Sequence, residues 1–381
     1  MKTELVATCL FGLEKLLGEE IDALGFKRIE TIDGRVTFEA ELSDVPTANI
    51  FLRTAERVYI KVGAFEAKSF EELFEGVHAM RWEKYISRND AFPVKGHCIK
   101  SSLFSVRDCQ SIIKKAVSKR LGNLYGVSWF EETAVKYQIE FFIFKDIATL
   151  MIDTSGIPLH KRGYRPASGE APLRETLGAA IAMTTRPREN VLLWDPFCGS
   201  GTIAIEAAMI MKGIAPGLNR LFAAEEFGII PRECWKNARE KAVSMINSTE
   251  FEAWGSDIDD NVLEFAKANA ARAGVEDVVK FFHADARKIE KPDRRGTIAC
   301  NPPYGERLMD IKEAEQLYRD IGKNFASFES WQMYILTSNE NFDRLFGRRS
   351  DKVRKLYNGM IPCNLYQYFK PQIKKVEKIK K

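Results

Sequence analysis

A glycine-containing turn between a buried strand and a helix constrains the fold of this chain more than any other segment. Residues 191–194 form a continuous apolar run, the pattern of a strand buried in a parallel sheet. The turn 195–202, Asp-Pro-Phe-Cys-Gly-Ser-Gly-Thr, follows, and 203–212 reads as a helix. Strand, turn and helix in this order form the front of a nucleotide site in a doubly wound α/β sheet. Gly199 and Gly201 let a ligand approach the backbone, and the helix N-terminus points its N–H groups at that ligand.

The turn alone does not identify the nucleotide. The spacing Gly199-x-Gly201-x-x-Ala204 also fits the dinucleotide fingerprint, so NAD and S-adenosylmethionine (SAM) both remain open. Asp195 discriminates better, because a carboxylate just before the turn repels a pyrophosphate and suits the ammonium group of an amino-acid cofactor. An NAD-dependent oxidoreductase is further disfavoured because we find no catalytic His or Tyr-Lys constellation.

Two more predicted strands end in carboxylates. The strand 251–256 leads to Asp257, which can accept hydrogen bonds from both ribose hydroxyls, with Ile258 packing on adenine. The strand 278–283 leads to Asp285, which can accept from the adenine amino group. Either aspartate alone could be a helix N-cap. Their succession at strand ends predicts a cofactor site, because ligands of open α/β sheets bind where the strands end.

A further apolar run, 297–300, is followed by Asn301-Pro302-Pro303-Tyr304. An exocyclic base amine is a poor nucleophile, because its lone pair is delocalised into the ring. The Asn301 side-chain oxygen and the Pro302 carbonyl can accept its N–H bonds and favour the pyramidal nitrogen of the transition state. Tyr304 offers a flat face for an extruded base. The alternative interpretation is a proline-rich turn after a strand.

At these motifs the chain resembles class I SAM-dependent amino-methyltransferases that modify RNA. More closely, it resembles the THUMP-domain RNA guanine-N2 methyltransferases, in particular the guanine-N2 half of ribosomal RNA large subunit methyltransferase L. The resemblance covers nearly the whole chain and is strongest from about residue 155. The segments that carry it are Asp195–Thr202, Gly255-Ser-Asp257, His283-Ala-Asp285-Ala286, Asn301-Pro-Pro-Tyr-Gly-Glu-Arg-Leu308, Leu159-His-Lys-Arg-Gly-Tyr-Arg-Pro166 and Ala171-Pro-Leu-Arg-Glu-Thr176.

The resemblance implies SAM as the cofactor and a methyltransferase domain with a seven-stranded, mostly parallel α/β sheet whose last strand is antiparallel. It implies the cofactor-binding residues Glu175, Thr176, Asp195, Phe197, Gly199, Gly201, Thr202, Asp257, Ile258, Asp285, Ala286 and Asn301. The catalytic residues it implies are Asn301, Pro302, Pro303 and Tyr304. Fused members of the family carry a second methyltransferase domain. This chain ends after one, so the second activity is not expected.

A length of 381 residues suits more than one domain. The resemblance assigns residues 1–41 to a ferredoxin-like domain, 42–154 to a THUMP RNA-binding domain, 155–170 to a connector and 171–381 to the methyltransferase domain. Apolar periodicity before the connector predicts helices over 13–24, 70–80 and 109–121, and strands over 4–9, 35–39, 137–144 and 148–153. Beyond residue 300 it predicts a helix over 311–327 and strands over 332–337, 353–357 and 364–369.

Composition narrows the partners. The seven cysteines form no C-x-x-C pair, which predicts reduced thiols of a cytoplasmic protein. The four histidines show no ligand spacing, so no metal is expected. We find no signal peptide or long apolar segment, so no membrane is expected either. The formal net charge of +4 permits RNA binding without demonstrating it.

Three basic segments are candidate RNA contacts. Cations on one short helix can bind phosphates or simply be a solvated helix face; they are Lys114, Lys115, Lys119 and Arg120. A glycine-containing loop beside the active domain can hold a splayed nucleotide; it carries Lys161, Arg162, Tyr164 and Arg165. The lysine-rich segment 374–381 fits a frayed, solubilising tail better than an RNA contact.

The sequence therefore predicts methyl transfer from SAM to an exocyclic base amine of RNA, foremost guanine N2 in 23S ribosomal RNA. The alternatives are an N6-adenine methyltransferase acting on DNA or RNA, a transfer RNA guanine-N2 methyltransferase, and a non-catalytic RNA chaperone or ribosome-assembly factor. The THUMP-like region and the segment 159–166 argue against DNA. The complete set of site motifs argues against a protein without catalysis.

Overall fold

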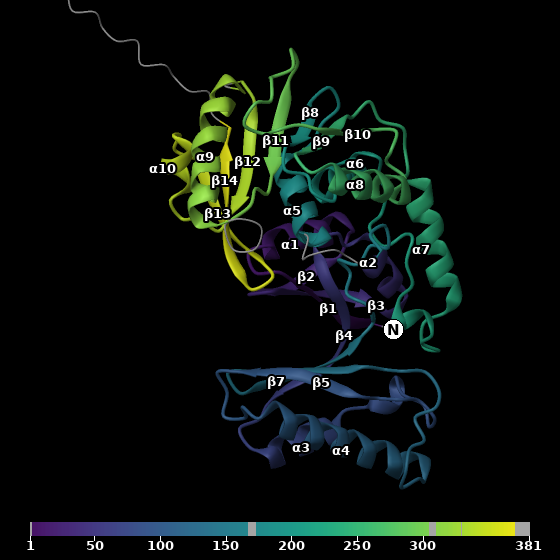
Figure 1. Ribbon diagram of the computed structural model, residues 1–381. Coiled ribbons are helices and arrows are strands. Elements are labelled where there is room, and N and C mark those ends of the chain that lie inside the picture. The colour runs from purple at the N-terminus through teal and green to yellow at the C-terminus, as the bar shows by residue number, and fades with distance from the viewer. Residues whose placement is uncertain (1, 167–172, 305–309, 329, 370–381) are drawn as a thin grey trace, which may run out of the picture. The chain divides into compact units, whose positions relative to one another are not determined.

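The computed structural model describes residues 2–166, 173–304, 310–328 and 330–369, and the chain divides into two compact units (Figure 1). The first unit contains Met1–Cys9, Glu14–Leu159 and Gly217–Ala242, and the second contains Leu10–Leu13, His160–Pro216 and Val243–Lys381. The chain therefore passes between the units several times.

One seven-stranded sheet runs through the first unit. Its order is β2 (Lys27–Ile32), β3 (Arg35–Glu41), β1 (Lys2–Cys9), β4 (Ala55–Glu66), β7 (Ile147–Asp153), β6 (Ile139–Phe144) and β5 (Val94–Ile99). All neighbours are antiparallel except β5 and β6, which are parallel. The long strand β4 pairs with β1 on one edge and with β7 on the other. It thus joins the predicted ferredoxin-like and THUMP regions into one sheet.

The helices of the first unit begin at recognisable caps. At α3 the Ser69 hydroxyl accepts from the Glu72 N–H, and the Glu72 carboxylate accepts from the Ser69 N–H. At α4 the Ser105 side chain accepts from Asp108, and Gly126 ends the helix with φ +65°. The helices are α1 (Glu14–Ala23), α2 (Val45–Phe51), α3 (Phe70–Ala79), α4 (Val106–Tyr125) and, except for its last residues, α7 (Arg232–Ser244). At 20 residues, α4 is not the short helix that the sequence predicted.

The segment Gly217–Ala242 belongs to the first unit, although the sequence analysis placed it in the methyltransferase domain. Backbone bonds attach it there, from Gly217 N–H to the Ile50 carbonyl and from Ala224 N–H to the Thr154 carbonyl. The Phe227 ring stacks on Tyr137 with 4.1 Å between centroids. The start of this segment is therefore attached to residues far away in sequence, a pairing that local periodicity cannot reveal.

The second unit contains the predicted doubly wound sheet. Its order is β10 (Val279–His283), β9 (Ala253–Asp257), β8 (Leu192–Asp195), β11 (Gly296–Cys300), β12 (Gln332–Thr337), β14 (Ile361–Tyr368) and β13 (Lys352–Asn358). The first five strands are parallel, and β14 runs antiparallel to both β12 and β13. This confirms the predicted fold class, including the reversed last strand.

Helices cover both faces of this sheet (Figure 1). They are α5 (Glu175–Thr185), α6 (Thr202–Met211), α8 (Asp260–Ala273), α9 (Ile311–Phe325) and α10 (Phe342–Phe346). Helices α9 and α10 pack on β11, β12 and β14 through a cluster of buried apolar residues. The Asp310 side chain caps α9 by accepting from Glu313 N–H at 2.8 Å. The capped helix starts a few residues after the Asn301–Tyr304 loop, so its position is fixed close to the candidate site.

Seven elements of the structure, β2, β4, β5, α2, α5, α7 and α10, were not predicted from sequence patterns. Strand β2 shows why such elements are hard to recognise: nearly all its side chains are exposed, so no apolar alternation marks it. Helix α5 is buried on almost every side, so it has no polar face to give a helical period.

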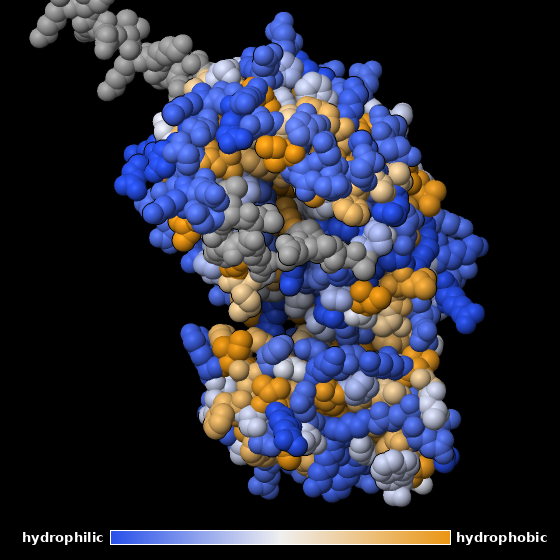
Figure 2. Space-filling model, viewed as in Figure 1, coloured by the Kyte–Doolittle hydropathy of each residue, from blue (hydrophilic) through white to orange (hydrophobic). Residues whose placement is uncertain are grey.

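Some predicted features lie outside the described residues: 167–172 of the connector and following motif, 305–308 of the last motif, and the segment 374–381. No helix among the described residues is long and apolar enough to cross a membrane. On the face seen in Figure 2, hydrophobic residues are interspersed among hydrophilic ones. The seven cysteines are all free thiols.

Gly296 at the start of β11 provides a test of the core packing. A Cβ at this position would lie 2.3 Å from the Trp331 ring, whose indole N–H is bonded to the Arg294 carbonyl. We expect Gly296→Ala to lower the free energy of unfolding by about 1–3 kcal/mol, because the ring cannot move freely. Equilibrium urea unfolding measures this change. Gly228→Ala is the control, since a Cβ there meets nothing within 4 Å. Equal stability of the two variants would contradict the packing described.

Candidate active site

Four polar residues lie at one edge of the second sheet. Asp195 ends β8 and Asp257 ends β9, Asp285 follows β10, and Asn301 follows β11. These four strands are neighbours and parallel, in the order β10, β9, β8, β11. Their carboxyl ends therefore meet at the same edge, where ligands of such sheets bind.

The glycine turn after β8 leaves room for a ligand. Gly199 has φ +49°, and a Cβ there would meet nothing within 4 Å. Gly201 has φ +83° at the start of α6, and a Cβ there would lie 2.6 Å from the Phe281 ring. A side chain at position 201 would clash with the Phe281 ring, so packing requires a glycine there. Gly199, in contrast, leaves open space beside the backbone.

Asp195 is a buried acid with few groups that stabilise its negative charge. Its side chain accepts from the Phe197 N–H at 3.1 Å and is 2% exposed. Burial, and secondarily the nearby Asp257 charge, raise the pKa of the Asp195 carboxyl to about 8. A cationic group bound beside it would restore the carboxylate. The chemistry of this site therefore fits the ammonium group of SAM.

Asp257 holds the glycine turn. One of its oxygens accepts from the Gly199 N–H at 2.9 Å and the other from the Asp259 N–H at 3.2 Å. The carboxylate is half-buried and retains lone pairs for the ribose hydroxyls. Ile258 is 59% exposed, so its side chain is accessible to an adenine ring.

The remaining predicted cofactor residues have mixed surroundings. Asp285 forms a bidentate pair with Arg287, at 2.8 and 2.7 Å, which lowers the pKa of the Asp285 carboxyl. An adenine amino group would have to share that carboxylate. Ala286 is buried in the apolar core beneath the sheet edge, and Thr202 is buried at the start of α6. Phe197 is half-buried and packs against the same core as Ala286.

Arg165 connects the segment before the sheet to the glycine turn. Its guanidinium lies 2.8 Å from the Glu175 carboxylate and donates to Thr202 Oγ1 at 3.2 Å. It also donates to the Leu173 carbonyl at 3.2 Å. Glu175 and its neighbour Thr176 are both buried in the first turn of α5. The structure thus places Arg165 beside the glycine turn, where the sequence suggested only a contact with RNA.

Arg162 and Tyr164 do not fit their predicted contact with RNA. Arg162 is 3% exposed and lies 3.3 Å from the Glu206 carboxylate. The Tyr164 hydroxyl donates to the same carboxylate at 3.3 Å. Glu206 is fully buried on α6, where an unpaired charge would be costly, so both side chains point inward to satisfy it. Of the two neighbouring cations Lys161 and Arg162, only Lys161 is exposed.

The cations of α4 are partly engaged in the first unit. Lys114 pairs with Glu132 and lies 3.6 Å from the centroid of the Phe92 ring. Arg120 pairs with Glu83 at 2.7 Å. Two of the four predicted RNA-binding cations therefore already have partners within the protein. Lys115 and Lys119 are exposed.

The Asn301–Tyr304 loop is held by hydrogen bonds on both sides. The Tyr304 hydroxyl donates to Asn301 Oδ1. The hydroxyl of Tyr318, on α9, donates to the Pro303 carbonyl at 2.6 Å. Pro302 is buried. Among the described residues, none donates a hydrogen bond to its carbonyl. Tyr318 could not be recognised from sequence patterns, because an aromatic residue on an apolar helix stripe is usually only part of the core.

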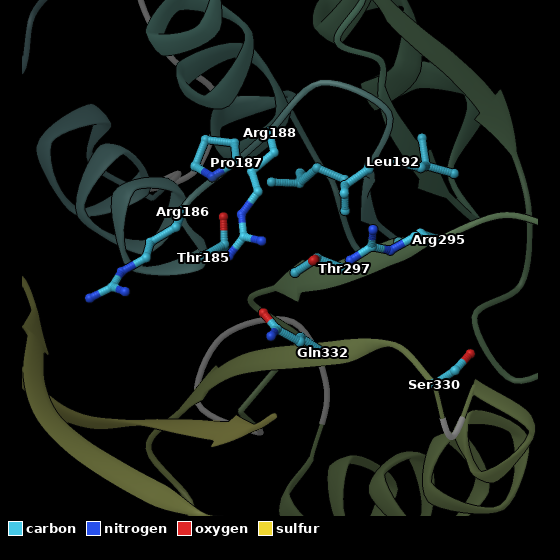
Figure 3. A pocket seen from close by; sticks show the side chains of 12 residues that line it. Thr185, Arg186, Pro187, Arg188, Leu192, Arg295, Thr297, Ser330 and Gln332 are labelled. Atoms are coloured by element: carbon cyan, nitrogen blue, oxygen red, sulfur yellow. The ribbon is translucent and has the colours of Figure 1, made fainter. Parts of the chain in front are cut away.

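A pocket of about 100 Å³ lies at the opposite edge, where β8, β11 and β12 begin. Figure 3 shows Arg188 and Arg295 reaching toward it and Arg186 pointing away. Arg186 and Arg188 follow the C-terminus of α5, whose carbonyl end favours cations. The position of these two arginines is therefore explained by the helix end, and no ligand is needed to account for it.

Comparison with known proteins identifies the class of protein that this fold and site define. Residues 162–367 match the family described as RMKL-like, methyltransferase domain. Residues 4–59 match the RlmL ferredoxin-like domain, and residues 67–153 match the THUMP domain.

Two relatives illustrate the similarity. "Putative RNA methyltransferase YpsC" of Bacillus subtilis is 42% identical over 99% of this chain and 99% of its own length. "Ribosomal RNA large subunit methyltransferase K/L" of Psychromonas ingrahamii is 33% identical over 94% of this chain and 49% of its own length. The chain therefore spans about half the length of the K/L relative.

Three solved structures have the same fold. A "possible methylase" from Clostridium difficile has a TM-score of 0.94 at 42% identity, covering 98% of this chain and 99% of its own. A "predicted N6-adenine-specific DNA methylase" from Listeria monocytogenes has a TM-score of 0.91 at 43% identity, covering 97% of each chain. SMU.472, described as "a putative methyltransferase complexed with SAH", has a TM-score of 0.91 at 39% identity, covering 98% of this chain and 99% of its own.

The chain is thus a SAM-dependent class I methyltransferase. It belongs to the RMKL-like methyltransferase family and carries the ferredoxin-like and THUMP regions of that family.

The raised pKa of Asp195 predicts that cofactor affinity depends on pH. Below about pH 8 the buried carboxyl of the free protein is protonated, and binding the cofactor ammonium requires it to release that proton. SAM affinity should therefore increase from pH 6 to 7.5, by at most about tenfold per pH unit. Calorimetry in buffers of different ionisation heat measures both the affinity and the proton release.

Asp195→Asn is the matched control, because it cannot titrate. It should bind SAM more weakly and with a flatter pH profile. An unchanged pH profile in this variant would exclude Asp195 as the group that binds the ammonium.

Proposed function

We propose that this chain transfers the methyl group of SAM to an exocyclic amine of a base in RNA, foremost guanine N2 in 23S ribosomal RNA. The observation that carries the proposal is the Asn301–Tyr304 loop at the same sheet edge as Asp195 and Asp257. RNA is supported as the substrate by the THUMP region and by the names of the relatives. Ribosomal RNA is supported by the K/L relatives, which the chain matches over about half their length.

The residues of the chain have distinct tasks in this proposal. Bound SAM supplies a methyl group made electrophilic by its sulfonium. Asp195 and Asp257 hold the cofactor by its ammonium and ribose groups. Asn301 Oδ1 and the Pro302 carbonyl accept the two N–H bonds of the target amine and favour its pyramidal form. Orientation and exclusion of water supply most of the catalysis, and the acidic alkylated ammonium loses its proton afterwards.

The contact between Tyr304 and Asn301 bears on how the base enters. The Tyr304 hydroxyl occupies Asn301 Oδ1, the acceptor that the target amine needs. Burial raises the pKa of this hydroxyl well above its ordinary value, so it remains a donor at neutral pH. An amide oxygen has two lone pairs, so the incoming amine either shares Asn301 Oδ1 with this hydroxyl or displaces it.

The first unit supplies RNA affinity in this proposal. The exposed Lys115 and Lys119 of α4 remain the candidate phosphate contacts there. In the second unit Lys161 remains a candidate. The buried Arg162 and Tyr164 are assigned to the interior instead.

Adenine N6 is the second candidate target. The Listeria structure is described as an N6-adenine methylase, and adenine also presents an exocyclic amine to an Asn-Pro-Pro-Tyr loop. Transfer RNA is a second candidate substrate. Mass spectrometry of nucleosides from purified ribosomal and transfer RNA of a deletion strain separates these cases. We expect loss of N2-methylguanosine from large-subunit ribosomal RNA and its return with the wild-type gene. Loss of N6-methyladenosine instead would overturn the guanine assignment.

The catalytic loop gives a sharper test. Asn301→Ala should slow methyl transfer by roughly a hundredfold or more, because one preorganised transition-state acceptor is lost. SAM affinity should change much less. Single-turnover assays with saturating SAM and RNA measure the rate. A near-normal rate would mean that the loop is only a turn.

Tyr304 variants separate stacking from hydrogen bonding. Tyr304→Ala should weaken retention of the base by roughly 1–3 kcal/mol if the ring stacks on it. Tyr304→Phe keeps the ring and removes only the hydroxyl that competes for Asn301, so its rate should be largely retained. Equal losses in both variants would show that the hydroxyl, and not the ring, matters.

A further inference from the structure

The catalytic loop has few backbone donors of its own. Pro302 and Pro303 follow each other, and neither has an N–H group. Within the loop only Asn301 and Tyr304 carry an N–H group, so donors from outside the loop help to hold its carbonyls. A loop that must aim two acceptors at one amine nevertheless requires a fixed backbone.

Tyr318 supplies one of those donors from the core. Its side chain is 0% exposed, and its hydroxyl donates to the Pro303 carbonyl at 2.6 Å. The same hydroxyl lies 2.9 Å from Thr337 Oγ1, at the end of β12. Thr337 Oγ1 in turn accepts from the Asn339 N–H at 3.1 Å. A chain of hydrogen bonds thus links the end of β12 to the catalytic loop.

The two ends of this chain fix the direction of every proton. The Asn339 N–H can only donate, and the Pro303 carbonyl can only accept. The Tyr318 proton must therefore point at Pro303, and the Thr337 proton must point at Tyr318. Each hydroxyl has one donor role and one acceptor role filled, so the arrangement has no equivalent alternative. Such a chain is strengthened by cooperativity in a buried setting.

The surroundings keep Tyr318 in this position. The Phe342 ring packs edge-on against it with 5.0 Å between centroids. The Tyr366 hydroxyl of β14 donates to the Asn339 carbonyl at 3.0 Å, which anchors the far end of the chain. Burial raises the pKa of the Tyr318 hydroxyl to about 12, so it keeps its proton throughout the neutral range.

We propose that Tyr318 is a positioning residue for methyl transfer, which fixes the catalytic loop through the Pro303 carbonyl and is itself oriented by Thr337. The Pro303 carbonyl shares a peptide plane with the Tyr304 N–H. Holding it fixes the direction in which Tyr304 leaves the loop and limits rotation of the Pro302 carbonyl one peptide earlier. The inference rests on the proposed role of the Asn301–Tyr304 loop as the acceptor of the target amine.

Tyr318→Phe tests the inference, because it removes the hydroxyl and keeps the ring packed on Phe342. We expect the single-turnover rate at saturating SAM and RNA to fall about tenfold or more, since a small misplacement of acceptors costs much rate. The dissociation constant of SAM should stay within about twofold, because Asp195 and Asp257, which hold the cofactor in this proposal, lie on other strand ends. A rate within twofold of wild type would overturn the proposal.

Tyr368→Phe is the matched control for stability. Tyr368 is also 0% exposed, in the same apolar cluster, and its hydroxyl donates to Asp343 at 2.7 Å without reaching the loop. Its thermal midpoint should drop as in Tyr318→Phe while its rate is kept. An equal loss of rate in both variants would reduce Tyr318 to a structural role.

Thr337 variants test the direction of the chain. Thr337→Val removes the donor to Tyr318 and should give a smaller loss of rate than Tyr318→Phe, because the bond to Pro303 remains. Thr337→Ser keeps a hydroxyl and should recover the rate lost in Thr337→Val. No recovery with serine would contradict the hydrogen-bond chain.

Asn301→Ala, measured in the same assay, distinguishes failure of this inference from failure of the proposed function. If Asn301→Ala is inactive and Tyr318→Phe is normal, only the positioning role is wrong. If Asn301→Ala is as active as wild type, the proposed function of the loop itself fails.

Discussion

The parallel pairing of β10, β9, β8 and β11 is the constraint on which the rest of the site depends. Only parallel neighbours bring the carboxyl ends of successive strands to one edge, and each of these strands delivers its polar residue there. A one-residue shift in any register would turn Asp195 or Asp257 to the other face of the sheet. The buried apolar strands make such a shift costly, so the core sets the geometry of the site.

The strand ends could be predicted from the sequence because local and global signals agree there. Apolar runs ending in Asp195, Asp257 and Asn301 identify strands, while the glycines mark the turn between strand and helix. The loop before α5 could not be predicted in the same way. Arg162 and Tyr164 look like a basic, exposed loop until Glu206 is considered. A single acid within the apolar helix Thr202–Met211 must find a partner, and that was the available signal.

Long-range packing accounts for the other differences. The segment Gly217–Ala242 follows the cofactor strand in sequence, yet its aromatic residues pack in the first unit. Nothing in its own periodicity names the partner surface. Likewise, β2 has almost no buried side chains and is defined mainly by its backbone pairing to β3. Sequence patterns report burial, so elements held mainly by the backbone or by distant partners remain invisible to them.

The catalytic loop combines these two kinds of information. Its prolines remove internal donors and make the chain locally stiff, which the sequence shows directly. Stiffness alone does not aim a carbonyl, however, because the whole turn can still tilt about its ends. The direction comes from Tyr318 and Thr337, which belong to α9 and β12 and reach the loop only in the folded protein. The local sequence thus determines which groups the site contains. The core that the same strands build determines how those groups are oriented.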